Sequence, residues 1–156
     1  MAPTTTSIST TAPATWIAEH EALPIVSWDD GDGFDPRSDY VETYWLSVLG
    51  PSSILALRRL TDWLEDNPSG IVVALEDLAL SLGLGHSTSR HSAIVRTLDR
   101  LVGFGVAKVD WDAYAVRSTI PPLTARQLRR LPAYLAERHD RDLTAQRTST
   151  AAGDAC

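Results

Sequence analysis

The stretch LEDLALSLGLGHSTSRHSAIVRTLDRLVGFGVAKVDWDAYAVR, residues 75–117, holds the clearest structural pattern of this chain. Apolar residues at helical spacing predict a helix over residues 76–84, which stops at glycine, and a second helix over residues 92–101. The Gly-Phe-Gly break at 103–105 then leads into two short alternating segments, 106–109 and 113–117, which predict a β-hairpin. Two helices joined by a turn and followed by a hairpin are typical of a module that presents one helix to a groove.

The second predicted helix has two faces of different character. Residues 94, 98 and 101 are apolar and share one face, which we expect to be buried. The opposite face carries Ser92, Arg96, Asp99 and Arg100. Arg96 and Arg100 lie one helical turn apart, a spacing that suits contacts with adjacent phosphates or with the edge of a groove. The arginines could instead solubilise the outer face of a core helix, but we favour contact with a macromolecule.

Ser92 is the predicted N-cap of this helix, because its hydroxyl can accept a hydrogen bond from a backbone N–H of the first turn. This assignment places Arg90 and His91 in the turn before the helix. Cationic side chains beside a helix N-terminus favour phosphate oxygens. The turn therefore belongs to the predicted contact surface.

Several positions in this stretch form one pattern: Leu78-Ala79, Leu82-Gly83-Leu84, Ile94, Arg96, Leu98, Leu101 and Gly105-Val106-Ala107. The pattern resembles the winged helix-turn-helix superfamily, which includes many bacterial transcription regulators and several plasmid replication initiators. The resemblance covers about residues 52–118 and points to no single family. It implies that Ser92, Val95, Arg96 and Arg100 lie where members of the superfamily often contact DNA.

The expected fold is α+β and mostly α-helical: a winged helix-turn-helix with a small β-hairpin and extra N- and C-terminal helices. The expected function is that of a transcriptional regulator which binds double-stranded DNA and reads the major groove with the helix at about 92–102. Arg96 would read guanine or grip a phosphate. The full set of expected DNA contacts is Arg90, His91, Ser92, Val95, Arg96, Arg100, Arg126, Arg129 and Arg130.

Two features depart from the superfamily pattern. The connection GHSTSRH, residues 85–91, is longer than a common short turn, so either the second helix begins before Ser92 or a polar loop precedes it. The hairpin tip Asp110-Trp111-Asp112 is acidic, and phosphates would repel its carboxylates. An exposed tryptophan there resembles a protein-contact anchor at least as much as a minor-groove wedge, although it can also pack against Tyr114.

These departures support a second hypothesis, in which the chain is a winged-helix protein-interaction module or an adaptor in a larger assembly, such as a nucleoprotein or replication complex. Its contact residues would be Trp111 at the hairpin tip and Trp16 and Trp28 in the N-terminal segment. Salt separates the two hypotheses, because DNA binding weakens steeply as counterions compete and an apolar protein contact does not.

The rest of the sequence predicts three zones: a flexible acidic and Thr-rich arm over residues 1–38, a domain over 39–143 and a disordered tail over 144–156. Within the domain we expect helices over 40–46, 51–67 and 124–131, and a further helix from Pro132 to about residue 143. A brief β-branched strand at 71–73 should pair with the hairpin. A homodimer could form through Tyr44, Trp45 and the C-terminal helices.

The net charge of −6 conceals an uneven distribution along the chain. Residues 1–85 hold 13 acidic side chains and three arginines, whereas residues 86–156 hold 11 basic and seven acidic ones. The second half is therefore basic, and the overall acidity does not exclude a nucleic-acid partner. The acidic segment 29–42 is expected to lie across the basic face and to compete with DNA.

No motif in the sequence predicts an enzyme, a cofactor or a metal site. The four histidines are scattered, and the only cysteine, Cys156, is the last residue. Acidic residues alternate from Asp30 to Asp35, but the later bidentate glutamate and flanking helices of a calcium loop are lacking. With neither a secretory signal nor an apolar run of membrane length, the composition predicts a cytoplasmic protein without membrane contact.

Overall fold

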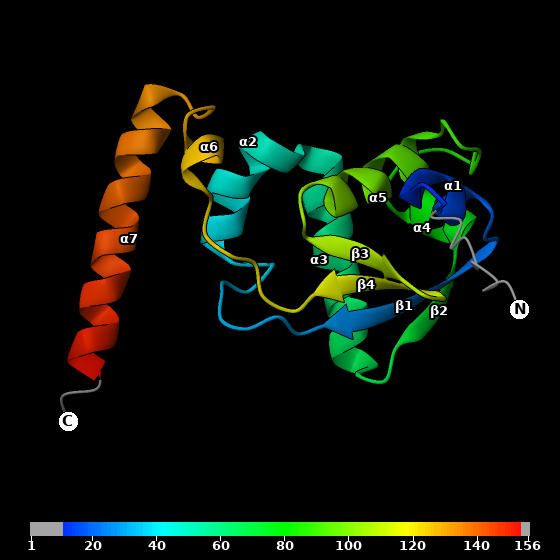
Figure 1. Ribbon diagram of the computed structural model, residues 1–156, viewed down its shortest axis with the longest axis horizontal. Coiled ribbons are helices and arrows are strands. Elements are labelled where there is room, and N and C mark those ends of the chain that lie inside the picture. Colours follow the sequence, from blue (N-terminus) through cyan, green and yellow to red (C-terminus); the bar gives the residue numbers. More distant parts are fainter. Residues whose placement is uncertain (1–10, 154–156) are drawn as a thin grey trace, which may run out of the picture.

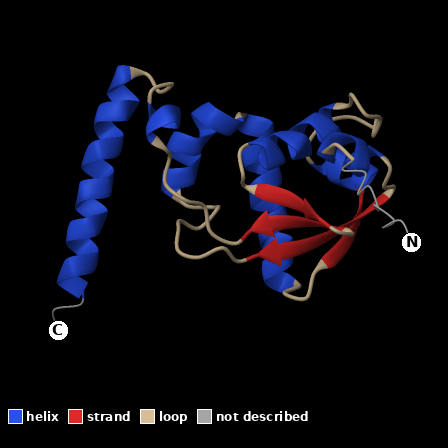
Figure 2. Ribbon diagram, viewed as in Figure 1, coloured by secondary structure: helices blue, strands red, loops and turns tan. Residues whose placement is uncertain are grey.

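The computed structural model describes residues 11–153 (Figure 1). In chain order its elements are α1 (Pro13–Ala18), β1 (Ala22–Trp28), the π-helix η1 (Val41–Trp45), α2 (Leu46–Leu49), α3 (Pro51–Asp66), β2 (Ile71–Ala74), α4 (Leu75–Ser81), α5 (Ala93–Gly103), β3 (Ala107–Asp110), β4 (Ala113–Arg117), α6 (Ala125–Leu128) and α7 (Ala133–Gly153). Figure 2 shows helices arranged around a four-stranded sheet. The expected α+β class is confirmed, and the sheet is larger than the predicted hairpin.

The sheet has the strand order β2-β1-β4-β3 and mixed directions. β3 and β4 form the predicted antiparallel hairpin. β1 runs parallel to β4, with Ile25 opposite Tyr114, and antiparallel to β2, with Ala22 opposite Ala74. The prediction that the strand at 71–73 pairs with the hairpin is therefore wrong, because β1 lies between them.

The N-terminal segment is part of the core, so the prediction of a flexible arm is wrong for residues 13–28. Ile17 of α1 and both Leu23 and Ile25 of β1 are fully buried. A proline within a run argues against a central strand, which is why the sequence pattern concealed β1. The pairing of β1 with β4 begins at Ile25, one residue after Pro24. At Pro24 itself, β1 pairs only with β2. Residues 1–10 of the expected arm lie outside the described residues.

The core joins the sheet to α3 and α5. Figure 1 shows α3 behind the sheet and α5, α4 and α1 along its upper edge. Leu57 and Leu60 of α3 and Leu98 of α5 are fully buried, and burial of each such side chain stabilises the fold by about 1.5–3 kcal/mol. The buried Tyr114 hydroxyl on β4 donates a hydrogen bond of 2.8 Å to the Leu98 carbonyl. Burial raises the pKa of Tyr114 well above its usual value, so this phenol stays a donor and fixes α5 on the sheet.

The C-terminal helices follow the expected order, with a longer last helix. Thr124 caps α6 and forms a capping box with Gln127, as the sequence predicts for the cap. The helix expected after Pro132 is α7, which continues to Gly153, so the prediction of disorder from residue 144 is wrong for the described part. α7 lies at the opposite end of the molecule from α1 (Figure 1).

Aromatic side chains of the segment 40–45 attach α7 to the body. The Tyr40 hydroxyl lies 2.7 Å from Nε2 of the buried His139 and accepts the Leu123 N–H at 2.9 Å. The Tyr44 hydroxyl donates to the Asp142 carboxylate. Burial, together with this carboxylate, raises the pKa of Tyr44 to about 12. These contacts place α7 relative to η1.

Tyr44 and Trp45 are buried inside their own chain, so the prediction that they form a homodimer contact is wrong. The Trp45 indole N–H donates to the Pro121 carbonyl at 3.0 Å. A buried tryptophan needs such a partner for its only polar group, and the contact ties η1 to the segment before α6.

Candidate nucleic-acid interface

Helix α5 begins where the sequence predicts it. The Ser92 hydroxyl accepts a hydrogen bond from the Val95 N–H at 3.4 Å, which confirms the predicted N-cap. The apolar residues at 94, 98 and 101 are fully buried, so the predicted inner face is confirmed as well. Ser92 itself is only 7% exposed and its hydroxyl is engaged in the cap. It positions the helix and is not an exposed contact residue, contrary to expectation.

Val95 is fully buried, so its assignment as a DNA contact is wrong. Helix α5 packs against α1 on one side and α3 on another, and these neighbours widen its apolar face beyond the stripe at 94, 98 and 101. The sequence analysis did not predict α1 as a neighbour of α5, because residues 13–18 were expected to belong to a flexible arm. The outward face of α5 therefore holds fewer exposed residues than the sequence predicts.

Arg96 and Arg100 are both exposed on that outward face, but they differ in their surroundings. Arg100 donates a hydrogen bond of 2.8 Å to the Val48 carbonyl, and its guanidinium carbon lies 5.4 Å from the centre of the Phe104 ring. No hydrogen bond or ion pair connects the Arg96 side chain to another residue in the described range 11–153. Arg96 is therefore the cation of α5 most available to an outside ligand.

Of the two alternatives for residues 85–91, an earlier start of the second helix or a polar loop, the structure has the polar loop, because α5 starts only at Ala93. Arg90 in this loop donates from Nε to the Thr15 hydroxyl of α1 at 2.9 Å. His91 is exposed. Arg90 and His91 thus lie just before the N-terminus of α5, as expected, and α1 holds the arginine in place.

The three arginines of the α6 region, Arg126, Arg129 and Arg130, are exposed. In the view of Figure 1, α2 lies between α6 and α5. No hydrogen bond or ion pair of the described residues joins these three arginines to Arg96 or Arg100. They form a separate basic segment, which a long ligand such as a duplex could reach in addition to α5.

An open cavity of about 740 Å³ lies beside the arginines of α5. One wall is the outward face of α5, with Arg96, Asp99 and Arg100. The opposite wall is the corner between α2 and α3, residues 49–53, and Leu84 and Phe104 complete the lining. The sequence predicted a new helix from residue 51 but did not place its start against α5, because about 40 or more positions separate the two segments.

The three tryptophans expected at a protein contact have different environments. Trp16 is half-buried and its ring packs on His20, with 4.1 Å between ring centres. The centre of the Trp28 ring lies 4.4 Å from Lys108 Nζ and 4.3 Å from the Arg117 guanidinium carbon, so this ring is engaged within the chain. Trp111 is 95% exposed at the hairpin tip. Trp111 therefore does not pack against Tyr114 and presents a free surface.

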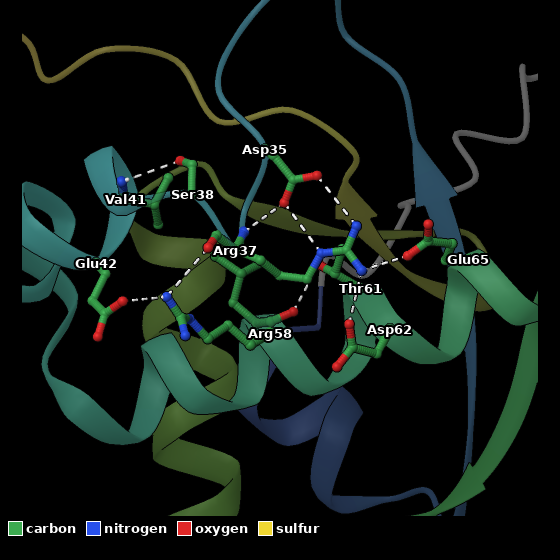
Figure 3. Close-up of polar contacts among 10 residues, drawn as sticks. Asp35, Arg37, Ser38, Val41, Glu42, Arg58, Thr61, Asp62 and Glu65 are labelled. Carbon is green, nitrogen blue, oxygen red and sulfur yellow. Dashed lines mark hydrogen bonds and ion pairs between the residues drawn. The ribbon is translucent and has the colours of Figure 1, made fainter.

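The acidic segment 29–42 pairs with arginines outside α5 and α6 (Figure 3). Arg37 contacts Asp35 at 3.2 Å, Asp62 at 2.9 Å and Glu65. The hydrogen bond from the Arg37 side chain is the main cause of a lowered pKa at Asp35, and its carboxylate partners, Asp35 first, raise the pKa of Arg37.

Two further ion pairs complete this pattern: Arg58 with Glu42 at 2.6 Å, and Arg117 with Asp30 at 2.9 Å. No ion pair of the described residues connects the segment 29–42 to Arg96, Arg100 or the α6 arginines. The expectation that this segment covers the basic face is wrong, because the ion pairs of its carboxylates join Asp30 to β4, Asp35 to Arg37 within the segment and Glu42 to α3.

Within residues 11–153, no group of three or more potential metal ligands comes together. No helix of this part of the chain is both long enough and apolar enough to cross a membrane. No family model, curated protein or solved structure matches this chain. We therefore infer function from the geometry of the described residues.

Proposed function

We propose that this chain is a winged helix-turn-helix protein that binds double-stranded DNA as a transcriptional regulator, with α5 in the major groove. The order α4, loop, α5 and the β3–β4 hairpin supports this proposal. The observation that carries it is the position of Arg96: exposed and unpartnered among residues 11–153, on a helix whose opposite face is fully buried. A cation held on a rigid helix is suited to a phosphate oxygen or to the edge of a guanine.

The other basic residues have supporting roles in this proposal. Arg100 uses one N–H on the Val48 carbonyl, and a guanidinium has four more for a phosphate. Arg90 and His91 approach the duplex backbone beside the N-terminus of α5. The α6 arginines extend the contact along the backbone. The carboxylates at 110 and 112 stay clear of the phosphates, so the wing tip does not enter the minor groove.

Fluorescence anisotropy with a random-sequence duplex tests the proposal. Affinity should fall steeply as salt rises from about 50 to 200 mM. Arg96→Gln should weaken binding at low salt by roughly tenfold and reduce the salt slope by about one. Arg147→Gln is the matched control, because Arg147 is an exposed arginine on α7. A native chain that binds no duplex at low salt, or equal losses for both variants, would contradict DNA binding through α5.

A protein-interaction module is the second candidate, and Trp111 favours it. This side chain is 95% exposed, and its φ of 56° lies in the left-handed region, which a bulky residue rarely adopts. Asp110 and Asp112 beside it favour a partner with a basic rim around an apolar pocket. Affinity capture with native and Trp111→Ser chains tests this function. A specific partner lost only with Trp111→Ser, and no duplex binding by the native chain, would favour it over DNA binding.

A further inference from the structure

The cavity beside α5 has the size of a small-molecule site. Its volume of about 740 Å³ falls within the range of roughly 300–1,000 Å³ that is common for ligand pockets. Its walls come from three parts of the chain: α5, the corner between α2 and α3, and Leu84 in the loop after α4. The position of α5 is fixed from the sheet side by the Tyr114 hydrogen bond to the Leu98 carbonyl, so this wall is rigid.

The lining combines apolar surface with an excess of positive charge. Leu49, Pro51, Leu84 and Phe104 supply apolar walls. Arg96 and Arg100 supply two guanidinium groups, against the single carboxylate of Asp99, which leaves a local charge of +1. Apolar walls favour a ligand with a hydrophobic body, and guanidinium N–H groups that have no partner in the described chain favour an anionic end.

The state of the two guanidinium groups strengthens this interpretation. Arg100 is held at the cavity by its hydrogen bond to Val48 and by its position over the Phe104 ring. Its remaining N–H groups are available without a costly rearrangement. Arg96 has no partner to lose within the described chain. A carboxylate, sulfonate or phosphate group could therefore contact both arginines at once.

We infer that this cavity binds a small organic anion that joins an aromatic or apolar body to one acidic group. A small inorganic anion would leave the apolar walls in contact with water. A neutral apolar ligand would desolvate the guanidinium groups without compensation. Such a small-ligand site is distinct from the duplex contact proposed for α5.

A titration with 2-naphthoate, followed by ¹H–¹⁵N NMR of the full chain, tests the site. The naphthalene ring supplies the apolar body and the carboxylate supplies the anion. We expect saturable shifts at α5 and at the α2–α3 corner. The neutral alcohol 2-naphthalenemethanol and inorganic phosphate, each with only one of the two features, should bind at least about tenfold more weakly.

Two variants locate the probe. Arg96→Gln removes one cation and should weaken 2-naphthoate about tenfold. Gly103 lines the cavity on α5, and a Cβ there would meet no atom within 4 Å, so the first atom of the leucine in Gly103→Leu has room and the substitution adds apolar volume at the cavity. This variant should also abolish or strongly weaken binding, whereas Arg147→Gln should not change it.

The inference would be overturned if 2-naphthoate did not bind at millimolar concentration, or if it bound both cavity variants as tightly as the native chain. Equal binding of the neutral alcohol would overturn the requirement for an anion. The titration contains no DNA, so its result does not depend on the proposed function. If the chain binds both DNA through α5 and 2-naphthoate in the cavity, the two ligands compete for Arg96. Anisotropy with added 2-naphthoate should then show release of DNA from the native chain but not from Gly103→Leu.

Discussion

Arginines occupy two contrasting environments in this fold. Beside α3, Arg37 contacts three carboxylates, and Arg58 pairs with Glu42 (Figure 3). On α5, Arg96 has no partner within residues 11–153, and Arg100 gives one hydrogen bond to a backbone carbonyl. The same kind of side chain therefore ties chain segments together in one region and stays available to a ligand in the other.

This contrast shows why a balance of charges along the sequence is a poor guide to the field that a ligand meets. Residues 1–85 are strongly acidic, yet four of their 13 carboxylates, Asp35, Glu42, Asp62 and Glu65, pair with arginines of the same region. The basic second half keeps exposed arginines on α5 and α6, although Asp99 lies among those of α5. Local pairing decides which charges remain for an outside partner.

The largest expected effect is on the free energy of unfolding, and it concerns Arg37 beside α3, which contacts three carboxylates. Arg37→Ala should lower the free energy of unfolding, and by more than any other substitution in this comparison. The substitution removes hydrogen bonds to three carboxylates and leaves Asp35, Asp62 and Glu65 to repel one another. Because the Arg37 side chain is about one third exposed, solvent screening keeps the loss below that of a buried network. Urea unfolding at pH 7 measures the change.

Arg96→Ala is the matched comparison for Arg37→Ala. Its side chain is exposed and unpartnered in the described part of the chain, so its unfolding free energy should change by less than about 0.5 kcal/mol. Equal destabilisation by the two substitutions would remove the contrast between the two regions. It would mean that Arg96 holds the fold together and is not reserved for a ligand.

The sequence predicted the elements between residues 51 and 117 closely, because helical spacing, the Ser92 cap and the glycine stops are all local signals. It failed where the outcome depends on long-range packing. It did not predict β1, which lies inside the sheet, or α1, which packs against α5, the helix that carries the fully buried Val95. The cavity beside α5 was not foreseen for the same reason, since segments distant in sequence form its walls.

A smaller effect is expected on DNA affinity within the α5 region. Asp99 lines the cavity with Arg96 and Arg100, and its carboxylate opposes the approach of a phosphate. If α5 contacts the duplex as proposed, Asp99→Asn should raise affinity at low salt by about twofold to fivefold, and salt should diminish the gain. Anisotropy measures this, with Asp66→Asn at the end of α3 as the control. A loss of affinity with Asp99→Asn would place the duplex elsewhere.

The smallest expected effect is the acid sensitivity of the paired region. Arg37 lowers the pKa of Asp35 in the folded chain, so the ionised carboxylate stabilises the fold above the pKa of the unfolded chain, near 3.9. This stabilisation is lost as the pH falls through the folded pKa. The native chain should therefore lose more unfolding free energy between about pH 5 and pH 3 than Asp35→Asn does, as measured by urea unfolding.

Arg96→Ala should keep the full acid sensitivity of the native chain, because no carboxylate of the described residues pairs with Arg96. Parallel pH profiles for the native chain and Asp35→Asn would show that the Arg37 cluster does not contribute through the charge of Asp35.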